Sequence, residues 1–85
     1  MKDGQHKNKH GSIFYTLDGK YHRDGAPAFE CVQFKAWYQH GKEHREDGAA
    51  VEYASGIKYW YLHGKLLTCS TQEEFEQLMR LRAFW

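Results

Sequence analysis

The sequence has few cysteines, a single proline, no long apolar run and almost no net charge. Its two cysteines, Cys31 and Cys69, match no metal-binding or redox spacing, so we expect them to be two small buried apolar residues. No segment approaches membrane-spanning length, and residues 1–12 are polar and lack the apolar segment of a secretory signal. The 12 basic and 11 acidic residues create no general basic field. These absences predict a cytoplasmic protein that binds neither membranes nor nucleic acid.

Aromatic residues are abundant instead, at 16% of the 85 residues. A chain of this length forms one domain and buries only about 60% of its unfolded surface, so its core is expected to be thin. Large rings bury much area per residue and suit such a core. Contact with another chain is therefore a natural expectation.

Aromatic pairs recur at intervals of 23 residues, and each pair is followed by a glycine and a lysine. The pairs are Phe14-Tyr15, Trp37-Tyr38 and Trp60-Tyr61, the glycines are Gly19, Gly41 and Gly64, and the lysines are Lys20, Lys42 and Lys65. His-Arg and Asp-Gly segments follow in the first two copies, at residues 22–25 and 44–48. The third copy has Leu67 in place of histidine, which is typical of a terminal, capping copy.

The strand and turn signals within these copies predict a mainly β (α+β) fold. Residues 35–39 and 57–62 are rich in aromatic or β-branched side chains, which favour strands. His40-Gly41 and His63-Gly64 have the form of two-residue hairpin turns, and residues 54–56 form a further turn signal. Residues 13–69 are therefore predicted to form an antiparallel meander of about three 23-residue hairpin repeats.

The last part of the chain changes to helical spacing. Ser70 and Glu73 form an apparent capping box, and the acidic residues precede the basic ones, so we expect a helix over about residues 71–83. Residues 70–85 would pack on the sheet as part of the same domain. Residues 1–12, with basic side chains such as Lys2 and Lys7, are expected to be a solvated arm.

The repeated pattern Trp-Tyr-x-x-Gly-Lys-x-His-Arg-x-Asp-Gly-x-Ala resembles a group of small proteins of tailed bacteriophages. Their repeats are similar in style to the membrane occupation and recognition nexus (MORN) β-hairpin repeats. The resemblance covers about residues 13–80, although the family's usual Asp-Gly-Pro-Ala reads Asp47-Gly48-Ala49-Ala50 in the second copy. It implies a phage origin and, for a protein of this size, binding and inhibition of a host factor.

The His-Arg-x-Asp-Gly segments are the most reactive-looking feature of the sequence. Histidine and aspartate can bind a metal or act as acid and base. We favour a structural role, because a catalytic group is needed once whereas a folding element recurs in every copy. The aspartates would then satisfy turn amides, and the arginines would pair with glutamates. The residues concerned are His22, Arg23, Asp24, His44, Arg45 and Asp47.

The aromatic pairs predict two unlike faces, because adjacent strand residues point to opposite sides. One helix can cover only one face, so the other is free to contact a partner. We expect the helix to cover the larger rings and the tyrosines to form an outer row. The predicted covered row is Phe14, Trp37 and Trp60, and the predicted outer row is Tyr15, Tyr38 and Tyr61.

These features predict a non-enzymatic, phage-encoded protein-binding module that inhibits a host defence component in the host cytoplasm. Its partner would be a host protein, with a second copy of the chain as another candidate, and no cofactor is expected. The alternatives are a nucleotide sponge that uses tyrosine, tryptophan and arginine, and a metal-dependent hydrolase that uses the His-Arg-Asp segments. The candidate binding residues are Tyr15, Tyr38, Tyr61, His40, His63, Arg23 and Arg45.

Overall fold

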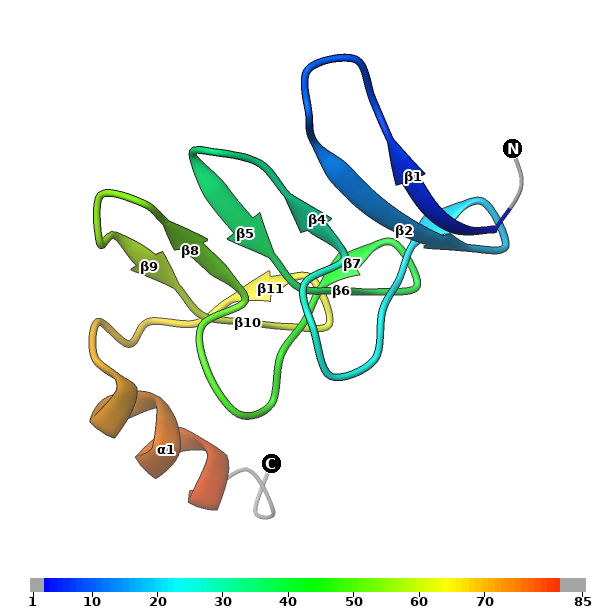
Figure 1. Cartoon of the computed structure of the whole chain (residues 1–85). Coiled ribbons are helices and arrows are strands. Elements are labelled where there is room, and N and C mark those ends of the chain that lie inside the picture. The colour runs from blue at the N-terminus through cyan, green and yellow to red at the C-terminus, as the bar shows by residue number, and fades with distance from the viewer. Residues whose placement is uncertain (1–2, 82–85) are drawn as a thin grey trace.

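The computed structural model describes residues 3–81, which form eleven short strands and one helix (Figure 1). The fold is mainly β with a C-terminal helix, as the sequence predicts. The elements are β1 (Gly4–Lys7), β2 (Ile13–Leu17), β3 (Lys20–Tyr21), β4 (Phe29–Glu30), β5 (Phe34–Ala36), β6 (Tyr38–Gln39), β7 (Lys42–Glu43), β8 (Val51–Tyr53), β9 (Lys58–Tyr59), β10 (Tyr61–Leu62), β11 (Lys65–Leu66) and α1 (Gln72–Leu81).

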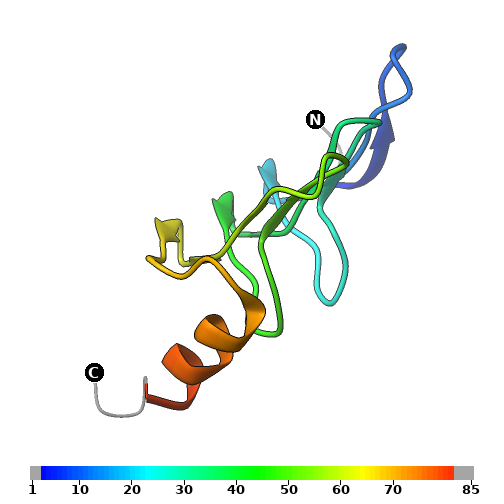
Figure 2. The same cartoon turned by 90° about the vertical axis from the view of Figure 1, so that its left-hand side faces the viewer.

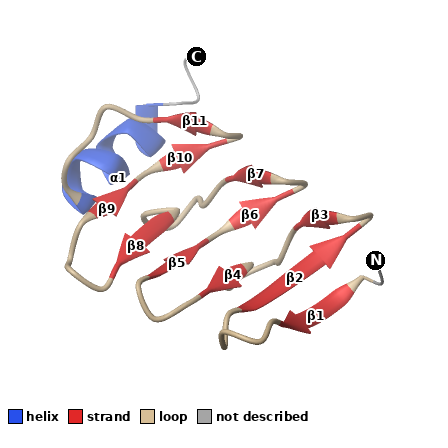
Figure 3. Cartoon of the chain, turned by 90° about the horizontal axis from the view of Figure 1, so that it is seen from above, coloured by secondary structure: helices blue, strands red, loops and turns tan. Residues whose placement is uncertain are grey.

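The main sheet is an antiparallel meander in the order β1-β2-β4-β5-β8-β9, with β3 paired to β2. The hairpins β6–β7 and β10–β11 form separate two-stranded units. Figure 3 shows these hairpins lying beside the end of β2 and β3 in a second row, while the meander strands lie along the other side of the molecule. The chain therefore alternates between the meander and the hairpin row.

The hairpin turns are built as the glycine signals predict. His40 has φ 51° and Gly41 has φ 83°, and the pair His63-Gly64 has nearly the same values. Two successive residues with positive φ form the turn whose twist matches that of antiparallel strands. Glycine reaches this conformation without steric cost, so the second turn residue fixes where each hairpin reverses.

The two long strands expected at residues 35–39 and 57–62 are each interrupted at a tryptophan. Trp37 separates β5 from β6, and Trp60 separates β9 from β10. Before each tryptophan the chain pairs within the meander, and after it the chain pairs with its own hairpin. The interruption thus follows from a change of pairing partner and not from a turn signal.

Consecutive hairpins are joined by backbone hydrogen bonds of one recurring kind. The Gly41 N–H donates to the Tyr21 carbonyl at 2.8 Å, and the Gly64 N–H donates to the Glu43 carbonyl at 2.8 Å. In the opposite direction the Arg23 N–H donates to the Tyr38 carbonyl at 3.2 Å. The hairpin row is therefore a stack whose order follows the chain.

The N-terminal segment is not a solvated arm. Residues 4–7 form β1, which pairs along β2 from Gly4 opposite Thr16 to Lys7 opposite Ile13. Asp3 accepts a hydrogen bond from the Gly19 N–H at 3.1 Å. Backbone pairing with the free edge of β2 orders this polar segment without an apolar pattern of its own. Lys2 lies outside the described residues.

The helix begins one residue later than expected, and its cap shifts with it. The Thr71 hydroxyl accepts from the Glu74 N–H at 3.1 Å, and the Glu74 carboxylate accepts from the Ser70 N–H at 3.1 Å. The capping box is therefore Thr71 to Glu74 and not Ser70 to Glu73. Leu81 is the last helical residue of the described chain, and residues 82 and 83 of the predicted helix lie outside it.

The core is small and lies under the helix. Trp60, Phe75 and Ala49 form its buried cluster, with exposed fractions of 3% or less. Trp37, expected in the same core, is only half-buried. Figure 2 shows why: α1 lies to one side of the sheet and reaches only its C-terminal end.

Both cysteines are free thiols that are only partly buried. Cys69 packs against the core cluster, and burial raises the pKa of its thiol. Among residues 3–81, no helix is long and apolar enough to cross a membrane.

Candidate functional site

One face of the sheet carries a continuous set of aromatic rings, which we call the aromatic face. Neighbouring rings touch from strand to strand: Phe29 and Phe34 at 5.4 Å between centroids, and Phe34 and Tyr53 at 5.6 Å. Tyr21 and Tyr38 extend the contacts into the hairpin row at 5.2 Å. The aromatic face comprises Phe14, Tyr21, Phe29, Phe34, Tyr38, Tyr53, Tyr59 and Tyr61.

The alternation of side chains along each strand assembles this face. Phe14 lies opposite Phe29 in the β2–β4 pair, and Phe34 lies opposite Tyr53 in the β5–β8 pair. Aromatic residues opposite one another across antiparallel strands stabilise the pair and favour its register. The small Ala36, which is 1% exposed, lies opposite Phe29 and leaves room for the surrounding rings.

The aromatic face is uncovered in the described chain. Tyr21, Tyr53 and Tyr59 are 37%, 40% and 42% exposed. The helix packs on the opposite side of the sheet, where Phe75 contacts Trp60. Contiguous exposed rings of this kind mark an interaction surface more often than an ordinary solvated face.

Charge is distributed unevenly between the two sides of the sheet. Lys35 lies opposite Glu30 and Glu52, and Lys58 lies opposite Glu52, all on the side away from the rings. Glu43 lies opposite Tyr38 and therefore shares the aromatic side. Burial, followed by the nearby Glu43 carboxylate, raises the pKa of Tyr38. The aromatic face thus combines apolar area and phenol hydroxyls with one carboxylate.

On the helix side, each aromatic ring of one row is covered by a different group. The Arg23 guanidinium lies 3.9 Å from the centroid of Tyr15, and the Arg45 guanidinium lies 3.9 Å from that of Trp37. Trp60 is covered by the helix, and its indole N–H donates to the Gln72 side chain at 3.1 Å. The two arginines and the helix therefore cover the rings of this row.

The predicted composition of the two faces is wrong for Phe14 and Tyr15. The His22 N–H donates to the Tyr15 carbonyl, as the His44 N–H donates to that of Trp37. Tyr15 is therefore the counterpart of Trp37 and lies under Arg23, on the helix side. Phe14 lies on the aromatic face with Tyr38 and Tyr61. Counting back four residues from each turn glycine gives this alignment, because the turn fixes the register of its hairpin.

The histidines at the turns lie in the hairpin stack and not on the aromatic face. The His40 N–H donates to His22 Nδ1 at 3.0 Å, and the His63 N–H donates to His44 Nδ1 at 2.9 Å. The rings of each pair are also in contact, with centroids 4.5 and 4.4 Å apart. His22 and His44 are thus hydrogen-bond acceptors that join consecutive hairpins.

The arginines and aspartates hold the loops that carry them, and Arg45 also contacts an aspartate. Arg45 donates to Asp47 at 2.8 Å, to Glu52 at 3.2 Å and to the Ala49 carbonyl at 3.1 Å. Asp24 accepts from the Gln39 side chain at 3.1 Å. The aspartates therefore accept from side chains, whereas the sequence predicted that they accept from turn amides.

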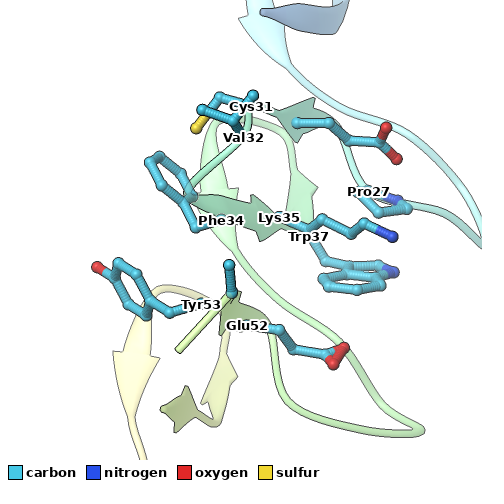
Figure 4. A pocket seen from close by; sticks show the side chains of 10 residues that line it. Pro27, Cys31, Val32, Phe34, Lys35, Trp37, Glu52 and Tyr53 are labelled. Carbon is cyan, nitrogen blue, oxygen red and sulfur yellow. The ribbon is translucent and has the colours of Figure 1, made fainter. Parts of the chain in front are cut away.

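Two hollows border these features. One, of about 440 Å³, lies around β5, with Phe34 and Tyr53 on one side and Lys35 and Trp37 on the other (Figure 4). Another, of about 480 Å³, lies between the two Asp-Gly loops beside Trp37. Among residues 3–81, no three histidine, cysteine, aspartate or glutamate side chains gather in a way that could hold a metal ion.

The structure therefore divides the predicted site residues among three places. Tyr38 and Tyr61 lie on the aromatic face, and the other five lie elsewhere in the fold. Sequence reasoning missed five rings of this face, whose signal is an aromatic residue beside a charged one in each short strand: Tyr21, Phe29, Phe34, Tyr53 and Tyr59. No protein-family model, curated protein or solved structure matches the chain.

Proposed function

We propose that this protein is a non-enzymatic binding module that attaches to another protein through its aromatic face. The observation that carries the proposal is the uncovered series of rings across β2, β4, β5, β8 and β9. Tyrosine is favoured at protein interfaces because its ring supplies apolar area while its hydroxyl tolerates water. The fold holds these rings on paired strands, so little conformational freedom is lost on binding.

The chemistry of the face specifies the kind of partner. Its interior is apolar, and Glu43 beside Tyr38 and Tyr61 is its one charged group from the hairpin row. A complementary surface has an apolar centre and a lysine or arginine that pairs with Glu43. Nucleic acid fits less well, because lysines such as Lys35 and Lys58 lie opposite glutamates on the other side of the sheet.

The resemblance to phage proteins supports a host protein as this partner and inhibition of a host defence component as the outcome. In that proposal the protein acts in the cytoplasm of the host and works by occupying a surface of its target. We further propose that the chain consists of three copies of a 23-residue hairpin unit. The recurring contacts of His22 with His40 and of His44 with His63 support this unit.

The test combines affinity capture from host extract with calorimetry on the identified target. Tyr53→Ala removes an exposed ring and should weaken binding at least tenfold, with the melting temperature nearly unchanged. Glu43→Lys should weaken it as well, because the expected partner is basic there. Leu81→Ala, at the end of α1 on the opposite side of the sheet and 49% exposed, is the matched control and should bind normally. Unchanged binding by both face variants would refute the proposal.

The nucleotide alternative uses the same residue types and is tested separately. Arg45 already donates to Asp47, Glu52 and the Ala49 carbonyl, so a phosphate would compete with these partners. Native mass spectrometry with candidate nucleotides distinguishes the two functions. A stoichiometric nucleotide adduct that is lost in Arg45→Ala would favour the nucleotide function.

A further inference from the structure

Consecutive hairpins of the stack contact one another in the same way. The residue after the turn lysine of one hairpin accepts a backbone hydrogen bond from the turn glycine of the next hairpin. The Tyr21 carbonyl accepts from the Gly41 N–H, and the Glu43 carbonyl accepts from the Gly64 N–H. The stems of Lys20 and Lys42 lie against these same glycines, 3.3 Å from where a Cβ would stand. A hairpin in this stack therefore offers one strand edge and a lysine stem to its neighbour.

The last hairpin offers the same edge without a neighbour in the described chain. Leu66 lies opposite Tyr61, as Glu43 lies opposite Tyr38, so its carbonyl is the counterpart of the two acceptors in the stack. Within residues 3–81 no further hairpin lies against β11, and Leu66 is 52% exposed. Beside it lies a groove of about 670 Å³, lined mainly by Leu62, Leu66, Leu67 and Leu78.

The opposite end of the stack is closed. There, β1 pairs with the outer edge of β2, and Asp3 accepts from the Gly19 N–H at 3.1 Å. Gly19 is the turn glycine of the first hairpin, as Gly41 is of the second. The Asp3 carboxylate therefore accepts the hydrogen bond that a backbone carbonyl accepts from Gly41. Two copies cannot stack head to tail unless β1 is displaced, and open-ended assembly is thereby disfavoured.

We propose that the free edge of β11 binds a second copy of this chain, with the two β11 strands antiparallel about a two-fold axis. In this arrangement the N–H of Leu66 in each copy donates to the carbonyl of Leu66 in the other. An antiparallel edge is self-complementary in this way, because a residue that points its N–H outward also points its C=O outward. The two leucine-lined grooves close over each other, which removes apolar surface from water.

This dimer goes beyond the proposed function and also changes the shape of its binding surface. Leu66 is paired with Tyr61, so its side chain shares the side of the aromatic face. Edge pairing through β11 therefore joins the aromatic faces of two copies into one surface. The axis lies at the end of each face and leaves the rings of Phe34 and Tyr53 open to a partner.

The first test is the oligomeric state in solution. Light scattering with size exclusion, from about 1 µM to about 1 mM, the range in which weak interfaces form, should give twice the chain mass of 10.1 kDa at the upper end. Leu66→Lys puts a charge at the edge and should raise the dissociation constant at least tenfold. Ile57→Lys replaces a similarly exposed apolar residue far from β11 and should leave the dimer intact.

The second test does not depend on the stability of the lysine variant. With Cys31→Ser and Cys69→Ser as background, Leu66→Cys should form an intermolecular disulfide at the concentrations at which the wild type is dimeric, because opposed residues of paired strands lie within disulfide reach. Ile57→Cys is the matched control and should remain reduced far longer under the same conditions. Equal cross-linking of the two variants would contradict the proposed geometry.

The remaining outcomes separate this proposal from the proposed function. A protein that stays monomeric throughout the concentration series overturns the dimer and leaves partner binding by the aromatic face intact. A dimer that survives Leu66→Lys but is lost in Tyr53→Ala also overturns it, since the two copies would then meet through the aromatic face.

Discussion

The guanidinium carbon of Arg45 lies 3.9 Å from the centroid of the Trp37 ring. The same guanidinium donates to Asp47 and Glu52, so one side chain covers a ring and joins two carboxylates. Arg23 repeats the ring contact on Tyr15 and donates to the Pro27 carbonyl at 3.2 Å. The helix side of the sheet is thus covered by arginines where the helix does not reach.

Replacing Arg45 should destabilise the fold even though the residue is only partly buried. Arg45→Met keeps an apolar stem but removes the cation–π contact and the charged hydrogen bonds, at a cost of about 2 kcal/mol. Urea unfolding followed by circular dichroism measures the change. Arg80→Met, in the exposed last turn of α1, is the control and should cost at most about 0.5 kcal/mol. Equal losses of stability in the two variants would show that the contact of Arg45 with Trp37 does not stabilise the fold.

The acceptor role of His44 makes a second prediction. His44→Leu removes the group that accepts from the His63 N–H and should cost about 1 kcal/mol, because this turn amide must then bond to water. His44→Asn keeps a short side-chain acceptor and should retain most of the stability. Equilibrium unfolding of both variants checks the ranking. If asparagine is as damaging as leucine, ring contact with His63 matters more than the hydrogen bond.

The turns and the helix are predictable from the sequence because single residues determine them. Gly41 and Gly64 adopt a positive φ that other residues rarely tolerate, so their place in the chain indicates the hairpins directly. The helix start is one residue in error because both Ser70 and Thr71 are good caps, and each has a glutamate three or four residues later. The hydrogen bond from the Glu74 N–H to the Thr71 hydroxyl distinguishes the two starts in the structure.

The faces and the N-terminal strand were harder to predict. Phe14-Tyr15 resembles Trp37-Tyr38 in kind, but the backbone bonds of Tyr15 match those of Trp37. Residues 4–7 contain no β-branched side chain and no phenylalanine, tyrosine or tryptophan. Their pairing depends on the free edge of β2 and on Asp3, and neither is visible in a local pattern.

The helix cap predicts a specific response to acid. Hydrogen bonds from the Ser70 N–H and then from the Ser70 hydroxyl lower the pKa of Glu74 below its ordinary value of 4.5. A carboxylate with a lowered folded-state pKa stabilises the fold fully above its ordinary pKa, and this contribution is lost as the pH falls through the folded-state pKa. The stability difference between the wild type and Glu74→Gln should therefore shrink below about pH 4.5.

Urea unfolding at several pH values between about 3 and about 7 measures this difference, since the ordinary carboxyl pKa lies within that range. Glu76→Gln is the matched control, because it removes the same charge from the same helix without touching the cap. A difference between wild type and Glu74→Gln that is independent of pH would show that the carboxylate charge does not contribute to the cap.

The last prediction concerns how the tryptophan before the last hairpin is covered without an arginine. Thr68 follows its turn glycine by four residues, as Arg23 and Arg45 follow theirs, and Phe75 from the helix covers Trp60 instead. Phe75 is 1% exposed and is the one residue of α1 that is fully buried. Phe75→Ala removes most of the helix's buried contact and opens a cavity beside the indole, so it should cost about 3–5 kcal/mol.

Thermal melts followed by circular dichroism test the effect, and helix content should fall before sheet content in Phe75→Ala. The control is Leu81→Ala on the same helix, which is 49% exposed and should change stability by about 0.5 kcal/mol or less. A helix that melts together with the sheet in Phe75→Ala would mean that other contacts hold it. The bond from the Gln72 side chain to the Asp47 carbonyl, at 3.3 Å, would then be the next contact to remove.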